Sequence, residues 1–223
     1  MLSIVIPTYN SGMTLAKTIN SLVPPPYARE VIVVDGGSSD DTLEIAQSLG
    51  AKIVQSDKGR GNQLKAGGEA ASGDWLLFLH ADTVLPEDWG QYVCTFVADE
   101  AMRRQAGYFT FALDENNLAA QRLEKIVSWR CKILGLPYGD QGLLISRYLY
   151  DQVGGFNALP LMEDVDIVRR IGKKRLHQLS TCAVTSAMRY QKEGYLKRMV
   201  RNLTCLTLYF LGISPEKIVK LYE

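Results

Sequence analysis

The chain has 223 residues, 47% of them hydrophobic, and its 25 basic and 24 acidic residues give a net charge of +1. This length suffices for one domain with a large core. The balanced charge argues against nucleic acid as a general partner. The four cysteines lie far apart, so neither a zinc-type CxxC pair nor a dense disulfide framework is expected, and reduced thiols are typical of a cytoplasmic protein.

The first residues, MLSIVIPTYN, lack a basic leader and meet a proline at position 7, so they predict a strand and not a signal peptide. No apolar run approaches the roughly 18 residues of a membrane span. The longest stretch, 203–213, contains two threonines and a glycine. We therefore expect a cytoplasmic protein, with contact at the inner face of the cell membrane as an open alternative.

Four apolar runs in the first 85 residues predict strands at 2–6, 30–34, 51–55 and 75–79. Helices are expected between them at 12–22, 42–49 and 63–71. Pro7 is expected to end the first strand, and the prolines at 24–26 to form a stiff connection. The alternation predicts a parallel sheet with right-handed crossovers.

Polar loops follow all four strands, with the sequences PTYN, DGGSSDD, DKGRGN and HADT. The carboxyl ends of parallel strands meet at one sheet edge, where α/β folds bind ligands, so a nucleotide pocket is expected there. Asp35 is placed to accept from a base or ribose hydroxyl, and Arg60 to reach a base edge or a phosphate. Asp82 is placed to hold a hard divalent cation. The alternative is that these residues only cap turns and helices.

The sequence after residue 85 predicts three strands, at 106–113, at 143–146 and before 182. Helices are expected at 86–97, at 147–153, up to about 171, at 195–211 and from 214. The helix expected at 117–134 interleaves Leu118, Leu123, Ile126, Val127, Ile133 and Leu134 with Arg122, Lys125, Arg130 and Lys132. It either packs on the sheet with a solvated basic face or contacts an acceptor or a membrane surface.

The segments IVIPTYN, VVDGGSSDDT, GRGNQ, HADT and MEDVD, in this order, resemble the family 2 glycosyltransferases. GRGNQLKAG, LPYGDQG and LMEDVDI are similar to one short, soluble bacterial branch of that family. The resemblance spans nearly the whole chain. It implies the GT-A fold, a single Rossmann-like α/β domain with a mostly parallel central sheet flanked by helices.

The resemblance further implies a nucleotide-sugar-binding half at 1–100, an acceptor-binding and catalytic half at 101–200, and a C-terminal helical appendage at 201–223. The implied reaction is inverting transfer of a sugar from a nucleoside diphosphate donor, by default UDP, to an acceptor hydroxyl with Mg²⁺ or Mn²⁺. The acceptor stays open among a lipid, a small metabolite and a glycan, and the sequence does not determine the oligomeric state.

Individual roles follow from the same resemblance. It implies that Asp164 is the catalytic base, with Glu163 beside it, and that Asp82 is the metal-binding last residue of a DxD motif. A glutamate and an aspartate at a helix start also suit the helix dipole, which is the alternative for this pair. The donor-binding residues would be Pro7, Thr8, Tyr9, Asp35, Arg60, Asp82 and Arg189, and the acceptor would face Asp140 and Gln141.

One departure from the family pattern is His80, which stands where the first Asp of the DxD motif is usual. It keeps open a nucleotide-sugar-binding protein that has lost transfer. A nucleotidyltransferase on a similar sheet is a further alternative, but it would carry cations in the loop after the first strand. That loop, PTYNSG, has none.

Overall fold

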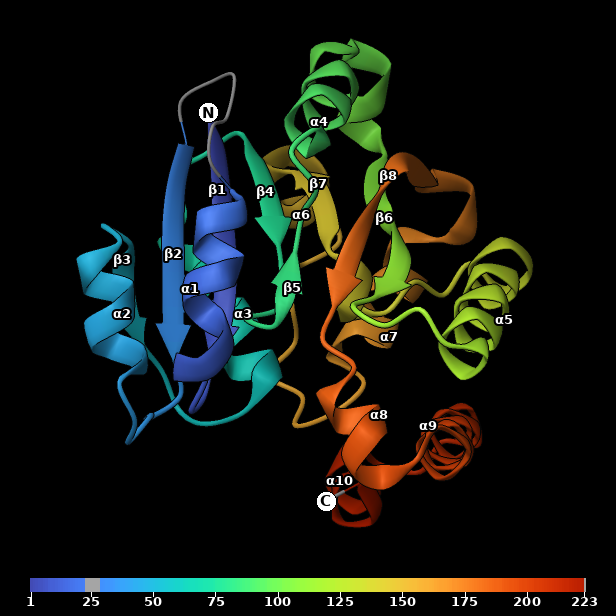
Figure 1. The fold of residues 1–223 in the computed structure, drawn as a ribbon. Coiled ribbons are helices and arrows are strands. Elements are labelled where there is room, and N and C mark those ends of the chain that lie inside the picture. Colours follow the sequence, from blue (N-terminus) through green and yellow to red (C-terminus); the bar gives the residue numbers. More distant parts are fainter. Residues whose placement is uncertain (23–28, 223) are drawn as a thin grey trace.

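The computed structural model describes residues 1–22 and 29–222 (Figure 1). The proline connection expected at 24–26 lies outside the described residues. Within them, eight strands form one sheet in the order β3-β2-β1-β4-β7-β6-β8-β5. The strands are β1 (Leu2–Thr8), β2 (Arg29–Asp35), β3 (Lys52–Gln55), β4 (Trp75–Phe78), β5 (Thr83–Val84), β6 (Ala106–Leu113), β7 (Leu143–Ser146) and β8 (Leu176–Thr185).

Strands β3, β2, β1 and β4 are mutually parallel, and β6 is parallel to β8. Strand β7 is antiparallel to both its neighbours, and β5 is antiparallel to β8. The predicted mostly parallel α/β sheet is therefore confirmed. Strand β5 was not predicted, because two residues are too few to show a strand pattern.

Helices cover both faces of the sheet (Figure 1). One face carries α1 (Gly12–Ser21), α2 (Thr42–Ser48) and α4 (Trp89–Ala98). The other face carries α3 (Arg60–Ala70), α6 (Arg147–Gln152) and α7 (Glu163–Ile171). Helices α9 (Tyr195–Phe210) and α10 (Pro215–Tyr222) add side chains to the same core cluster but lie beyond the end of the sheet (Figure 1). The remaining helices are α5 (Leu118–Leu134), which packs on β6, and α8 (Met188–Glu193).

Strand β1 shows how the sequence fixes this layering. Ile4 and Ile6 lie in the core beneath α1 and α4, whereas Val5 lies in the core beneath α3, since alternate residues of a strand face opposite sides. All three side chains are fully buried. Burial of each contributes about 1.5–3 kcal/mol relative to exposure, which explains why this strand carries no polar face.

The prediction that Pro7 ends the first strand was wrong, because Pro7 pairs with Val34 inside β1. The Val5 carbonyl accepts from the Leu79 N–H on the β4 side. Because residues of a parallel strand alternate between neighbours, the Pro7 nitrogen also faces that side, where β4 has already ended. The missing N–H therefore removes no ladder hydrogen bond.

Helix α3 begins at Arg60, three residues earlier than predicted, so Arg60 belongs to a helix and not to a loop. Gly61 allows this start, because a Cβ there would lie 2.4 Å from the Leu159 carbonyl oxygen. Gly67 and Gly68, which weaken the helix intrinsically, allow similarly close contact with Val5 and Tyr150. Helix α4 begins three residues later than predicted, after a turn in which the Trp89 N–H donates to Pro86.

Helix α5 buries a narrower apolar face than its sequence suggested. Leu123 and Val127 are buried against β6, but Leu118, Ile126, Ile133 and Leu134 are exposed. Packing on the sheet therefore accounts for only part of the apolar side chains of α5. None of the described helices is long and apolar enough to cross a lipid bilayer.

Candidate active site

The loops after β1, β4 and β8 meet at one edge of the sheet, as the strand order predicts. The Ser186 N–H after β8 donates to the Asp82 carbonyl, 3.1 Å away. The Thr185 hydroxyl donates to the Asp140 carbonyl at the same distance. The end of β8 thus holds the Asp82 loop and the Asp140 loop together, although 58 positions separate these residues in the sequence.

A cavity of about 470 Å³ opens at this edge. Tyr9 forms part of its wall, and the Lys58 ammonium lies 4.0 Å from the centre of the Tyr9 ring. Six of the seven predicted donor-binding residues line the cavity: Pro7, Thr8, Tyr9, Arg60, Asp82 and Arg189.

Asp35 is the seventh, and its donor-binding role stays a prediction, because Asp35 is not among the residues that line the cavity. Its carboxylate is buried and accepts from the N–H groups of Gly37 and Ser38, from the Ser38 hydroxyl and from the Thr8 hydroxyl. These bonds leave it outside the residues that line the cavity. Asp35 fixes the shape of the loop after β2 through its bonds to Gly37 and Ser38.

The predicted base, Asp164, lies in the first turn of α7. Its Oδ2 accepts from the Gly139 N–H at 2.9 Å, and its Oδ1 accepts from the Val165 N–H at 2.7 Å. Met162 precedes the helix with a left-handed φ of 66°, an uncommon conformation for a residue with a side chain. The hydrogen bond to Gly139 therefore attaches the α7 start to the loop that carries Asp140.

Glu163 is buried, and its Oε1 lies 3.4 Å from Arg60 Nη1. Burial raises the pKa of Glu163 to about 7, and the long contact with Arg60 only partly opposes this. Burial also disfavours the charge on Arg60, but the Glu163 carboxylate raises the Arg60 pKa above its ordinary value. The Arg60–Glu163 pair thus links the start of α3, which borders the larger cavity, to the start of α7, where Glu163 precedes Asp164.

A second, smaller cavity of about 100 Å³ lies beside the first. Asp140, Glu163 and Asp164 line it. Burial raises the pKa of Asp140 to about 6, and the Asp164 and Asp82 carboxylates add to this rise. Asp140 therefore binds a proton more readily than an exposed aspartate does, although it stays mostly ionised at pH 7.

Four residues that line the smaller cavity each have a buried polar atom without a hydrogen-bond partner in the described residues. The atoms are His80 Nε2, Asp140 Oδ1, Arg198 Nε and Asn202 Oδ1. Buried polar groups are nearly always paired in folded proteins, because an unpaired group loses its bonds to water. Their convergence on one cavity favours a polar ligand that pairs with them.

Gln141 is not among the residues that line this cavity, so its acceptor role stays a prediction. Its buried side chain donates to the Phe109 carbonyl and accepts from Arg130, Cys131 and the Tyr138 N–H. Arg130 also stacks on the Tyr138 ring, with its guanidinium carbon 3.3 Å from the ring centre. Gln141 thus fixes the loop so that its neighbour Asp140 points into the cavity.

The two cavities share a wall made by Arg60, His80, Asp82, Leu161, Ser186, Arg189 and Tyr222. Arg198 and Asn202 of α9 form another wall of the smaller cavity. These C-terminal residues were not predicted as site residues, because nothing in their sequence spacing separates them from a helix that only covers the core. The burial of Arg198, which marks it out, is known only from the structure.

Among the described residues, no cluster of three or more His, Cys, Asp or Glu side chains is arranged to hold a metal. Asp82 nonetheless supplies one carboxylate at the shared wall. Magnesium often binds through one or two carboxylates together with substrate phosphates. Asp82 therefore fits a metal ion that is bound partly by the protein and partly by a diphosphate. The protein alone does not supply a complete set of metal ligands.

The model of the family "Glycosyl transferase family 2" matches residues 3–103. A PGL/p-HBAD biosynthesis glycosyltransferase of Mycobacterium bovis is 38% identical over 95 residues, which cover 39% of this chain and 37% of the relative. Glycosyltransferase AglE of Haloferax volcanii is 27% identical over 58% of this chain and 46% of its own length. The chain thus matches less than half the length of these curated relatives.

Two solved structures share the fold. TarS of S. aureus, residues 1–349, superposes with a TM-score of 0.67 at 19% identity over 92% of this chain and 64% of that chain. Glucosyl-3-phosphoglycerate synthase of Mycobacterium tuberculosis, in complex with Mn²⁺, UDP and glucosyl-3-phosphoglycerate, has a TM-score of 0.62 at 20% identity, over 96% of this chain and 80% of that chain. The expected GT-A fold is confirmed by this likeness.

Proposed function

We propose that this chain, whose residues 3–103 match the model of the family 2 glycosyltransferases, transfers a sugar from a nucleoside diphosphate-sugar to an acceptor hydroxyl with inversion at the anomeric carbon. The observation that carries this proposal is the pair of adjoining cavities, with Asp164 in the smaller one and Arg60, Asp82 and Arg189 at the shared wall. TarS has been solved with UDP-GlcNAc, which favours UDP as the nucleotide.

In this proposal the donor occupies the larger cavity. The nucleoside lies against Pro7, Thr8 and Tyr9, and the diphosphate lies toward Asp82 and Arg189. Asp82 would hold Mg²⁺ or Mn²⁺, which supplies positive charge to the departing diphosphate. Structures of glucosyl-3-phosphoglycerate synthase contain Mn²⁺ or Mg²⁺, which supports this cofactor.

The acceptor occupies the smaller cavity. An Asp164 oxygen takes the proton of the acceptor hydroxyl as that oxygen attacks the anomeric carbon from the face opposite the diphosphate. The bond between the anomeric carbon and the diphosphate oxygen breaks, and its electron pair leaves with the diphosphate, which Arg189 stabilises. The four unpartnered polar atoms indicate that the acceptor hydroxyl belongs to a polar, hydrogen-bonding group.

The same proposal divides the chain by task. Residues 1–100 bind the nucleotide-sugar, and residues 101–200 supply the catalytic and acceptor groups. Residues 201–223 do more than cover the core, because Asn202 and Tyr222 line the cavities.

Nucleotide binding is tested by thermal shift with UDP, GDP, CMP and dTDP, each with and without Mn²⁺. A nucleotide at a hundredfold excess over its dissociation constant stabilises the fold by about 2.7 kcal/mol. We expect a metal-dependent shift with a nucleoside diphosphate. No shift with any of them would contradict donor binding.

Catalysis is tested by Asp164→Asn, with release of the nucleoside diphosphate measured against a panel of polyhydroxylated acceptors. We expect donor binding within twofold of the wild type and turnover lower by roughly 100- to 10,000-fold. Asp166→Asn is the matched control, because Asp166 lies on the same helix but pairs with Arg170 outside both cavities. Donor binding by the wild type without turnover on any acceptor would instead support a binding protein.

A further inference from the structure

Helix α5 presents an apolar stripe to solvent. Leu118, Ile126, Trp129 and Ile133 follow one another at spacings of three to eight residues, so they share one side of the helix. Trp129 is 59% exposed and Leu118 is 71% exposed. A monomeric soluble protein rarely leaves a row of large apolar side chains uncovered unless that surface has a partner.

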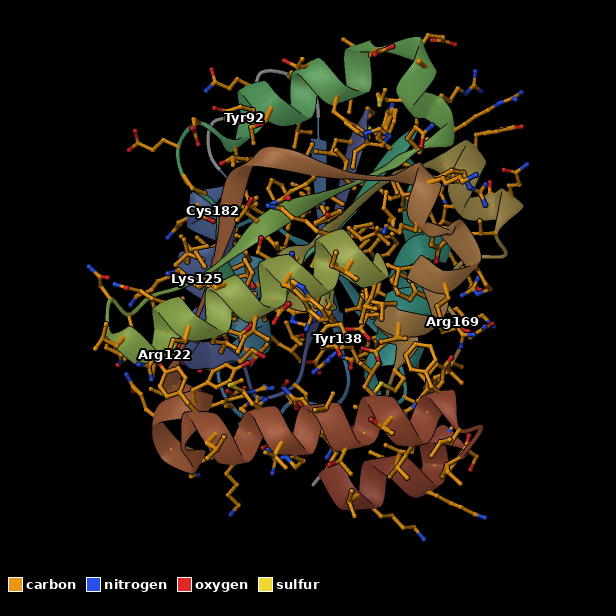
Figure 2. All side chains as sticks on the ribbon, turned by 90° about the vertical axis from the view of Figure 1, so that its right-hand side faces the viewer. Tyr92, Arg122, Lys125, Tyr138, Arg169 and Cys182 are labelled. Atoms are coloured by element: carbon orange, nitrogen blue, oxygen red, sulfur yellow. The ribbon has the colours of Figure 1, made fainter. Side chains whose placement is uncertain are left out.

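Helix α9 presents a second apolar stripe. Leu196 is 75% exposed and Leu203 is 64% exposed, and Val200 between them is exposed as well. Figure 2 shows α5 and α9 running across the same face of the molecule, one above the other, with Tyr138 between them. Met199 of α9 also packs against the core cluster beneath α5. We call the exposed side chains of α5 and α9 the docking face.

The charges of the docking face have one sign. Arg122, Lys125 and Lys132 of α5 and Lys197 of α9 are exposed, and no acidic side chain of either helix is exposed. In sequence the two helices carry seven basic residues and one acidic residue, although the whole chain has a net charge of only +1. Arg169 adds a guanidinium carbon 4.9 Å from the centre of the half-exposed Phe210 ring.

This composition selects among the possible occupants. Two copies that docked by a twofold axis would bring the same basic surfaces together, and the like charges would repel. Helices with apolar side chains, a tryptophan and interleaved lysines and arginines instead suit the boundary of an anionic bilayer, where the rings enter the headgroup layer and the cations meet acidic lipids.

We propose that the docking face binds the surface of an anionic lipid bilayer. This inference goes beyond the proposed transfer and does not depend on it. It has a consequence for the site, because Arg198 and Asn202 on the inner edge of α9 line the smaller cavity. One helix thus borders the membrane on its outer side and the acceptor cavity on its inner side.

The charge is tested by cosedimentation of the full chain with vesicles of phosphatidylcholine, with and without a quarter of phosphatidylglycerol. We expect binding to the anionic vesicles only, and weaker binding as salt is added. The double variant R122E/K125E should bind roughly tenfold more weakly or worse. Its control, K17E/K65E, makes the same charge change on exposed residues of α1 and α3 and should bind like the wild type.

The apolar contribution is tested by the double variant W129S/L203S, which should also lose binding to the vesicles. The control is L49S at the end of α2, which should bind the vesicles like the wild type. Thermal melting confirms that each variant folds. Equal binding to neutral and anionic vesicles, or equal losses in R122E/K125E and K17E/K65E, would overturn the proposal. A dimer in sedimentation velocity that W129S/L203S dissociates would also overturn it and would assign the face to a second copy.

Discussion

Glu163 is a buried carboxyl group with one ion-pair contact, at 3.4 Å from Arg60. Its pKa of about 7 in the folded chain lies above the usual 4.5, so the folded state holds its proton more tightly than the unfolded state does. The stabilisation is complete below about pH 4.5 and is lost as the pH rises through about 7. The full loss is on the order of 3 kcal/mol.

The substitution Glu163→Gln removes this ionisable group. The free energy of unfolding of the wild type should fall relative to the variant as the pH rises from 5 to 8. Urea denaturation at each pH measures this difference. A constant difference between the two proteins across that range would show that Arg60 holds Glu163 ionised throughout.

At the scale of single residues, the sequence predicted which loops meet but not what each polar side chain does. Asp82, Arg60 and Asp164 line the cavities as expected. Asp35 and Gln141 do not line the cavities, because the side chain of each forms hydrogen bonds with neighbouring protein groups. Sequence pattern cannot separate these outcomes, since the same residue types suit a ligand and a turn.

At the scale of elements, the start of α3 shows how one glycine positions the site. The Gly61 N–H donates to the Leu159 carbonyl, and a Cβ at Gly61 would lie 2.4 Å from that oxygen. Arg60 is the adjoining residue, so any shift of this helix end moves the guanidinium away from Glu163. The contact therefore serves both packing and the cavity wall.

Gly61→Ala should destabilise the protein by about 1–3 kcal/mol, because the start of α3 and the backbone at residues 157–159 must move apart to accommodate the methyl group. For a chain of this size each kcal/mol lowers the melting temperature by about 2–4 °C. Differential scanning calorimetry measures the shift. Lys65→Ala, at an exposed position of the same helix, should change stability by less than 0.5 kcal/mol. Comparable losses in the two variants would contradict the steric argument.

The elements of the first half were predictable because buried parallel strands and their helices have distinct hydrophobic patterns. Strand β5 was missed, since its two residues pair only with β8, about 100 positions later. Which apolar side chains of α5 stay exposed was left open for a related reason. An amphipathic pattern shows that a helix has an apolar side but not what covers it.

At the scale of the whole molecule, the C-terminal helices complete a site whose other residues come from the sheet edge. Tyr222 lines both cavities, and its hydroxyl accepts from Arg198 at 3.2 Å. Asn202 lines only the smaller cavity. The sequence indicated a helical appendage, but contacts between the end of the chain and its beginning depend on the complete fold.

This arrangement predicts different effects for two C-terminal variants. Tyr222→Ala should weaken binding of the nucleoside diphosphate roughly three- to tenfold, because it removes a contact of about 1 kcal/mol from the larger cavity. Asn202→Ala should leave that affinity unchanged. Isothermal titration with the nucleotide measures both. Equal affinities in the two variants would show that the donor does not reach Tyr222.

The excess of basic residues in α5 and α9 also gives the molecule an electric dipole moment. These two helices carry a net +6 and the rest of the chain −5, so the protein has a dipole, which is reduced where Glu193 beside α9 pairs with Arg198 and Arg201. Such a dipole turns the molecule before contact, so that the α5–α9 side leads toward any negative surface. The rate of that approach should fall as ionic strength rises, while the net charge, and with it the electrophoretic mobility, stays close to zero.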